Sequence, residues 1–248
     1  NDNDVYSEYT PVFANFPQCE GSDGISWSDN FNGGPEQEWS VYDMGESSSW
    51  SFANDRYELA TANSGLSSDK YILSGVNSCV GDAVISARIQ EIVTDDHYVA
   101  CVFLRGDPVT DSGYGATISS WGNLHITKRT GGGSNELLAS ATDLIADPTD
   151  CQIKFAAYGD TLYAKAWETG SPEPDAWDLE VTDTDFQYGH AGILLSSGSS
   201  EPGYSYFSPS RAAFDDLSVT VLTSATQRQA LIDLYNSTDG DNWTDNSG

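Results

Sequence analysis

The second half of the sequence contains the pattern that most restricts how this chain can fold. Two segments in which apolar and polar residues alternate, residues 151–159 and 161–168, meet at the pair Gly159 and Asp160. Glycine tolerates the positive φ that tight hairpin turns require, so these segments predict an antiparallel β-hairpin. Residues 212–222 alternate in the same way and predict a closing strand.

Upstream, short strand patterns are separated by clusters of Ser, Asn, Asp and Gly, which favour turns. No pattern of a three-turn helix occurs in residues 1–222. Many short strands separated by turns predict an all-β fold, a two-sheet antiparallel sandwich that forms one domain. The segments predicted as strands are residues 25–31, 48–55, 56–62, 69–75, 82–93, 97–106, 113–121, 123–129 and 136–142.

The sequence carries a formal charge of −28, from 38 acidic and 10 basic residues. A balance this acidic repels nucleic acid and anionic membranes, so we expect no nucleic-acid partner. The sequence also lacks an apolar run long enough to span a bilayer and an N-terminal basic-then-apolar segment. These features predict a soluble mature chain without membrane insertion.

Four cysteines occur at long spacings and without a C-x-x-C pair, which argues against zinc and for up to two disulfides in an oxidising compartment. Four cysteines allow three pairings. Cys101 and Cys151 each lie within an apolar strand pattern, so we favour Cys101–Cys151 together with Cys19–Cys79. The alternative is that Cys101 and Cys151 are buried free thiols.

One succession of segments resembles a known family. The segments that carry the likeness are residues 97–107 (HYVACVFLRGD), 113–119 (GYGATIS), 122–129, 135–168, 172–186, 189–195 and 212–222. The last of these contains the closing FDDLSV. From about Gly24 to Leu222 their order is similar to a concanavalin A-like lectin/glucanase domain of the laminin-G-like kind. This resemblance implies a jelly roll of two stacked, curved sheets whose concave face or loop rim commonly holds glycans, often with a structural calcium.

A second unit is predicted after Leu222. Ser224 and Gln227 have capping-box spacing, and Leu231 and Leu234 recur at a helical interval, which predicts a short C-terminal helix. The tail is similar to the cap that precedes leucine-rich repeats in many extracellular proteins; the alternative is a terminal helix that packs on the sandwich. The predicted units are an N-terminal extension at residues 1–24, the sandwich at residues 25–222 and the helical cap of a truncated leucine-rich repeat region at residues 223–248.

Catalytic motifs are missing from the sequence. Retaining glucanases of the resembling fold use an E-x-D-x-x-E strand, because two carboxylates about 5 Å apart act as nucleophile and acid. The sequence contains neither this motif nor a G-x-S-x-G elbow, and its three histidines are scattered. Glu173, Asp183 and Asp185 are interpreted as solvated surface carboxylates. We therefore predict that the protein is not an enzyme.

The resemblance also implies a position for calcium. A hard cation takes six to eight oxygen ligands, and in the resembling families a structural ion bridges an acid of the opening strand and an acid of the closing strand. Asp29 and either Asp215 or Asp216 are the matching residues here. The alternative is that these acids cap turns or face water.

Lysine and arginine are concentrated in the predicted strands, which is unexpected in so acidic a chain. Along residues 161–167, alternation places Tyr163, Lys165 and Trp167 on the face opposite the apolar residues. Aromatic rings offer flat faces to sugar C–H groups, and cationic donors bind carboxylate or sulfate oxygens. The candidate glycan-binding residues are Arg88, Arg105, Lys154, Tyr163, Lys165 and Trp167, with Trp121 and Trp177 at the rim.

The alternative interpretation of this face is a solvated surface on which lysines neutralise neighbouring acids such as Glu91, Asp160 and Glu168.

Two functions from different classes fit these features. The first is a non-catalytic carbohydrate-binding or adhesive domain, secreted or at the cell surface, that binds an extracellular glycan, including anionic glycans, or a surface protein. The second is a structural subunit that self-assembles into an extracellular fibre or surface assembly, with residues 1–24 added as a strand to a neighbouring sandwich.

Overall fold

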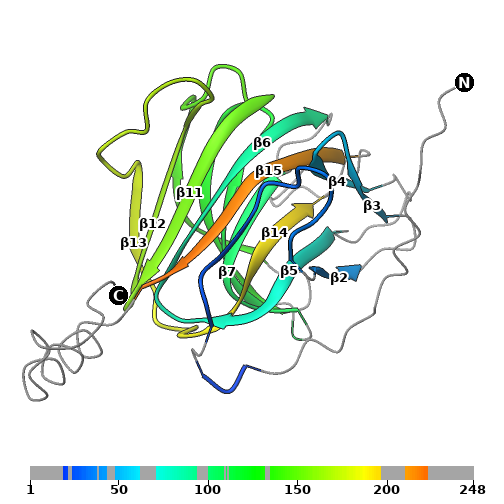
Figure 1. The fold of residues 1–248 in the computed structure, drawn as a ribbon. Coiled ribbons are helices and arrows are strands. Elements are labelled where there is room, and N and C mark those ends of the chain that lie inside the picture. Colours follow the sequence, from blue (N-terminus) through cyan, green and yellow to red (C-terminus); the bar gives the residue numbers. More distant parts are fainter. Residues whose placement is uncertain are drawn as a thin grey trace, which may run out of the picture.

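The computed structural model of the 248-residue chain describes residues 19–21, 24–37, 39–43, 48–61, 71–93, 100–108, 110, 112–131, 135–196 and 210–222. Within these ranges the regular secondary structure consists of strands (Figure 1), and no helix there is long and apolar enough to cross a membrane. The strands are β1 (Trp27–Asp29), β2 (Trp39–Asp43), β3 (Ser48–Ala53), β4 (Arg56–Thr61), β5 (Tyr71–Val80), β6 (Ala83–Val93), β7 (Ala100–Asp107), β8 (Ser112–Ile118), β9 (Leu124–Thr130), β10 (Asn135–Ala141), β11 (Asp150–Tyr158), β12 (Thr161–Glu168), β13 (Leu179–Thr182), β14 (Gly189–Ser196) and β15 (Ser210–Val221).

The strands form two stacked antiparallel sheets (Figure 1). Sheet A has the order β13-β12-β11-β6-β15-β4-β3, and β1 also pairs with β15. Sheet B has the order β10-β9-β8-β7-β14-β5-β2. The closing strand β15 lies between β6 and β4, so the last strand of the sandwich in sequence lies in the middle of sheet A. The predicted jelly-roll sandwich is confirmed, whereas the predicted C-terminal helix lies outside the described residues.

Strand alternation places the core between the sheets. Ile85 and Ile89 of β6 and Ile153 and Phe155 of β11 are fully buried. The alternate positions Ser86, Arg88 and Lys154 are partly exposed and face away from sheet B. Full burial of one such side chain contributes about 1.5–3 kcal/mol to folding. The β11–β6 register pairs Phe155 with Ile85, so the apolar residues of neighbouring strands meet on one face.

The hairpin predicted at the Gly159 and Asp160 pair is confirmed. Tyr158 and Thr161 are partners at the ends of β11 and β12, and Gly159 has a φ of 53°. The backbone N–H of Gly159 also donates to Asp82 Oδ1 at 2.9 Å, which ties this turn to the turn between β5 and β6. The tight turn therefore fixes the register of the two strands that carry four of the eight candidate glycan-binding residues.

The cysteine prediction is half correct. Cys19 and Cys79 form a disulfide, but Cys101 and Cys151 are buried free thiols, so the favoured pair Cys101–Cys151 is wrong. Cys151 lies in the core on the inner face of sheet A, whereas Cys101 lies on the outer face of sheet B beside Gly115. Cys151 points toward sheet B, whereas Cys101 points away from sheet A. Because stacked sheets are about 10 Å apart, the two sulfur atoms are too far from each other to form a disulfide. An apolar strand pattern shows that a cysteine is buried but not which sheet it belongs to.

Candidate functional site

Two lysines lie opposite each other on the outer face of sheet A. Lys154 of β11 and Lys165 of β12 are Cα partners in the antiparallel pair, and like charges in that position destabilise a sheet. Glu173, in the connection between β12 and β13, resolves the conflict. Its Oε1 lies 2.6 Å from Lys154 Nζ and 2.7 Å from Lys165 Nζ. We call these three residues the lysine–glutamate cluster.

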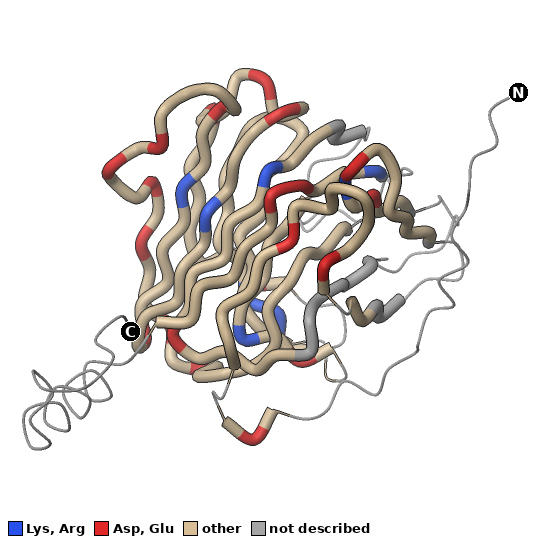
Figure 2. The backbone as a smooth tube through the Cα atoms, viewed as in Figure 1, with Lys and Arg blue, Asp and Glu red and all other residues tan. Residues whose placement is uncertain are grey.

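The connection that carries Glu173 is fastened to β12. Lys165 Nζ donates to Pro174 O at 2.6 Å. Asp178 N donates to Ala164 O at 3.0 Å, and Asp178 Oδ2 accepts from Ala166 N at 3.1 Å. Lys165 is therefore only 5% exposed, although it points away from the core. Figure 2 shows basic positions on neighbouring strands of sheet A and acidic positions along the connection beside them.

Three aromatic rings surround the lysine–glutamate cluster. Lys165 Nζ lies 4.9 Å from the ring centroid of Trp177 and 6.0 Å from that of Trp167, and Lys154 Nζ lies 6.0 Å from Trp167. The rings of Tyr163 and Trp177 are 5.7 Å apart and tilted by 37°. All three rings are partly exposed, so each can present a surface to a ligand beside a charged group.

A second row of residues extends this face toward the middle of sheet A. Arg88 of β6, Gln152 of β11 and Trp167 of β12 are successive cross-strand partners. Arg88 donates two hydrogen bonds to Asp150, at 2.8 and 2.7 Å, and this pairing lowers the pKa of the Asp150 carboxyl. The structure therefore brings six of the eight candidate residues to one face: Arg88, Lys154, Tyr163, Lys165, Trp167 and Trp177.

Arg105 does not belong to this face, contrary to the sequence prediction. It is 2% exposed, and its guanidinium donates to Gly81 O, Gly159 O and Phe186 O at 2.9–3.0 Å. It also forms an ion pair of 3.0 Å with Asp82. Arg105 thus joins three turns and connections at one end of the sandwich, where it closes the core.

Arg105 points into the sandwich because it lies in a β-bulge. The register of β7 and β8 shifts between Leu104 and Asp107, and Arg105 itself has a φ of 53°. A bulge re-aims the side chain that it contains, so Arg105 turns inward where strict alternation would place it outside with Phe103. The backbone of β14 passes very close here, since a Cβ on Gly189 would lie 2.4 Å from the carbonyl carbon of Arg105.

Lys128 of β9 is a second buried strand cation. Its Nζ contacts Asp183 at 2.7 Å, Asp185 at 3.0 Å and Glu136 at 3.1 Å. Tyr114 also donates to Asp183, at 2.5 Å. Asp183 is therefore not the solvated carboxylate that was expected. Lys128 lies on the inner face of β9 together with Leu124 and Ile126. These three residues are two positions apart in the sequence, and this spacing could have indicated that Lys128 is buried.

We call Arg105, Tyr114, Lys128, Asp183 and Phe186 the end cluster. Burial raises the pKa of Tyr114 to about 12, and the hydrogen bond to Asp183 acts in the same direction. Hydrogen bonds to Asp183 and Asp185 raise the pKa of Lys128. These shifts keep the tyrosine neutral and the lysine charged, as expected of groups that hold a connection in place.

Trp121, the other predicted rim residue, lies in the turn between β8 and β9 of sheet B and is 58% exposed. Its turn is well braced, because Gly122 O accepts hydrogen bonds from Leu144 N and Ile145 N, both at 3.0 Å. The lysine–glutamate cluster lies on sheet A, so Trp121 belongs to a different part of the surface.

Asp29 does not have the free oxygens that a calcium ligand needs. It is 1% exposed, and its carboxylate accepts hydrogen bonds from Phe31 N, Glu36 N, Gln37 N and Trp39 Nε1 at 2.9–3.2 Å. The acid organises the turn between β1 and β2. This corresponds to the alternative in which the predicted calcium ligands cap turns.

The two closing-strand acids, Asp215 and Asp216, directly precede Leu217, which is the Cα partner of Asp29. Asp215 is the Cα partner of Arg88, and it accepts a hydrogen bond from Asp216 N at 2.8 Å; Asp216 is exposed at a bulge. Among the described residues, the group of three or more ligand side chains close enough to share an ion contains none of these acids. Asp29 already accepts four hydrogen bonds, and calcium bound by Asp29 with Asp215 or Asp216 stays a prediction.

No family model and no curated protein matches this chain. Solved structures do match. The carbohydrate-binding module CBM66 from Bacillus subtilis is 16% identical with a TM-score of 0.54, covering 74% of this chain and 96% of that chain. A Bacillus licheniformis β-glucanase is 13% identical with a TM-score of 0.53, covering 81% and 100%. The VIP36 exoplasmic/lumenal domain, bound to Ca²⁺ and Man3GlcNAc, is 12% identical with a TM-score of 0.51, covering 80% and 88%.

These neighbours share a two-sheet β-sandwich with this chain. At such low identities the likeness shows the fold alone, and one fold supports both sugar-binding proteins and enzymes. What this chain does has to be argued from its own side chains.

Proposed function

We propose that the sandwich binds carbohydrate without catalysis, on the outer face of sheet A. The observation that carries the proposal is the grouping of Tyr163, Trp167 and Trp177 around Lys154 and Glu173. Sugars present apolar C–H faces and rows of hydroxyl groups. Aromatic rings bind the former, and charged donors and acceptors bind the latter with strong hydrogen bonds.

The charges favour a neutral glycan over an anionic one. Glu173 occupies the position between the two lysines that a sulfate or carboxylate group would need. Hydrogen bonds from Lys154 and Lys165 lower the pKa of Glu173, so it remains ionised at neutral pH. An anionic sugar would have to displace this carboxylate, whereas a sugar hydroxyl can bond to Lys154 or Glu173 where they stand.

The same pKa shift argues against hydrolysis at this face. A glycosidase needs a carboxylic acid that stays protonated, with a raised pKa, and a second carboxylate at a defined separation. Glu173 is shifted in the opposite direction and is bound to two ammonium groups. It is suited to hold the face together and to accept a hydrogen bond from a ligand.

We further propose that the protein acts outside the cell, on an extracellular glycan or a glycosylated surface protein. The Cys19–Cys79 disulfide supports this, because disulfides persist in oxidising compartments. Self-assembly through residues 1–24 and a leucine-rich repeat cap at residues 223–248 remain predictions, since residues 1–18 and 223–248 lie outside the described part of the chain.

A glycan array tests the proposal, with binding measured for the wild type, Trp177→Ala and the matched control Trp121→Ala. Trp177 adjoins Lys165 whereas Trp121 is exposed on the other sheet, so we expect Trp177→Ala to weaken binding roughly tenfold and Trp121→Ala to leave it unchanged. Circular dichroism would show that both variants fold. Equal effects of the two substitutions, or no glycan bound by the wild type, would contradict the proposal. A parallel array with chelator would detect any calcium requirement.

A further inference from the structure

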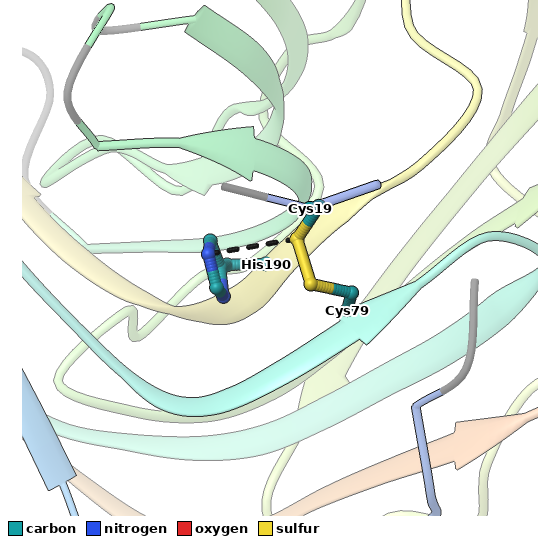
Figure 3. A group of neighbouring side chains, drawn as sticks. All are labelled: Cys19, Cys79 and His190. Atoms are coloured by element: carbon teal, nitrogen blue, oxygen red, sulfur yellow. Dashed lines mark hydrogen bonds between the residues drawn. A yellow bond between two sulfur atoms is a disulfide. The ribbon is translucent and has the colours of Figure 1, made fainter. Parts of the chain in front are cut away.

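The disulfide lies against a buried histidine, as Figure 3 shows. His190 is 2% exposed, and its Nε2 lies 3.5 Å from Cys19 Sγ. Cys79 of β5 and His190 of β14 are Cα partners in adjacent antiparallel strands, so their side chains share one face of sheet B. Sγ of Cys19, Sγ of Cys79 and a ring nitrogen of His190 all lie within 4.8 Å of one another.

One of these spacings matches that of a tetrahedral metal centre. With Zn–S bonds of about 2.3 Å and Zn–N bonds of about 2.0–2.1 Å, two ligand atoms at tetrahedral zinc lie about 3.6–3.8 Å apart. The 3.5 Å between Cys19 Sγ and His190 Nε2 already corresponds to this distance. The two sulfur atoms would have to separate once their bond is broken. The Cα atoms of Cys19 and Cys79 are 5.6 Å apart, so side-chain rotation can provide that separation.

We propose that reduction of this disulfide converts Cys19, Cys79 and His190 into a binding site for Zn²⁺, with a fourth position open to water. A small dithiol supplies the two electrons: it reduces the S–S bond to two protein thiols and leaves as its own cyclic disulfide. Binding of Zn²⁺ then replaces the two thiol protons, which are released, and His190 binds through a neutral ring nitrogen.

The surroundings of the site support both steps. Cys19 and Cys79 are half-buried, so a reductant can reach the disulfide, while the buried His190 is held in place by its strand. A backbone hydrogen bond of 2.7 Å from Gly24 N to Cys79 O keeps the segment that follows Cys19 near the end of β5 after reduction. Zinc would thus replace the disulfide as the link between this segment and sheet B.

The two other cysteines do not offer such a site. Cys101 and Cys151 lie on different sheets, and both are buried. Burial raises the pKa of Cys101 to about 11 and that of Cys151 to about 12, which disfavours the thiolate that a metal requires.

The test uses the full chain with Co²⁺ as a spectroscopic substitute for Zn²⁺. After reduction by a dithiol and removal of the reductant without air, we expect one Co²⁺ per chain, with a thiolate-to-cobalt absorption band that added Zn²⁺ abolishes. The oxidised chain should show no such band. His190→Gln should weaken Co²⁺ binding at least tenfold, whereas the matched control His125→Gln, on β9 of sheet B, and the double variant C101S/C151S should bind as the wild type does.

Three results would overturn the proposal. The first is a reduced chain without the thiolate band, and the second is a band of equal strength and affinity in His190→Gln. The third comes from the double variant C19S/C79S, which tests whether the sheets remain folded without the disulfide. Loss of its β-sheet circular dichroism at 25 °C would mean that no preformed site exists after reduction.

Discussion

Two clusters of basic and acidic residues in this sandwich use the same chemistry in different surroundings. The end cluster places Arg105 and Lys128 between the sheets, where turns and the connection before β14 surround them. The lysine–glutamate cluster lies on the outer face of sheet A under one connection. Both sets of cations come from strands of a chain with only ten basic residues. In such a chain a strand cation can serve folding or ligand binding, and burial decides which.

The difference is energetic. Exposed ion pairs contribute about 0–1 kcal/mol, because water solvates the separated charges well. Removing one partner of a buried pair costs about 3–5 kcal/mol, because the remaining charge keeps its desolvation penalty. The Arg105 side chain is fully shielded from solvent, whereas the Glu173 side chain is 42% exposed. Substitutions should therefore affect folding at the end cluster and ligand binding at the lysine–glutamate cluster.

The largest effect is expected for Arg105→Met. The substitution keeps most of the apolar stem but leaves Asp82 and three backbone carbonyls without their shared donor. We expect the free energy of unfolding to fall by about 3–5 kcal/mol, measured by urea denaturation. Arg211→Met is the matched control, since the Arg211 side chain is 44% exposed and its guanidinium lies 4.0 Å from Glu58; its effect should be below about 1 kcal/mol. Similar losses for the two variants would refute the distinction.

A smaller loss is expected for Lys128→Met. Without the ammonium group, Asp183, Asp185 and Glu136 repel one another, and the free energy of unfolding should fall by about 1–3 kcal/mol at pH 7. Glu136→Gln is the control, because this glutamate is largely exposed and Lys128 would keep two other partners.

The pH dependence of this variant provides a second measurement. Burial acts to raise the pKa of Asp183, but hydrogen bonds from Lys128 and Tyr114 outweigh it and lower the pKa overall. A folded-state pKa below the unfolded value means that this contribution is complete above about pH 3.9 and disappears as the pH falls through the folded pKa. The stability difference between wild type and Lys128→Met should therefore shrink as the pH is lowered below about 4. A difference that stays constant would show that Asp183 is not its source.

Local patterns predicted the sandwich and the outer face of sheet A. The turn at Gly159 and the alternation of Tyr163, Lys165 and Trp167 depend only on neighbouring residues, and the structure reproduces both. The likeness to concanavalin A-like domains correctly gave the class of fold. Where periodicity is regular, the faces of a strand can be assigned without knowing its partners.

Contacts between distant segments could not be predicted in this way. The bulge that turns Arg105 inward depends on its pairing with β8, and alternation alone placed it on the wrong face. The alternative interpretation, in which lysines neutralise nearby acids, named Glu91, Asp160 and Glu168. However, the acid is Glu173, which reaches Lys154 from 19 positions away because its connection folds back over β12. Cys101 and Cys151 could not be assigned to separate sheets for the same reason.

The smallest effect on stability is expected for Glu173→Gln. This variant tests whether the lysine–glutamate cluster serves ligand binding. The free energy of unfolding should change by about 1 kcal/mol, because the Glu173 side chain is 42% exposed and the buried Lys165 keeps its hydrogen bond to Pro174 O. Removing its charge leaves Lys154 and Lys165 facing each other without a counterion, so the variant should bind sulfated or carboxylated glycans more tightly than the wild type does.

Glu180→Gln, on neighbouring β13, is a control that removes one acidic charge without touching the lysines. If both variants gain affinity for anionic glycans equally, the gain reflects the net charge of the chain. A gain confined to Glu173→Gln would show that this residue selects against anionic ligands.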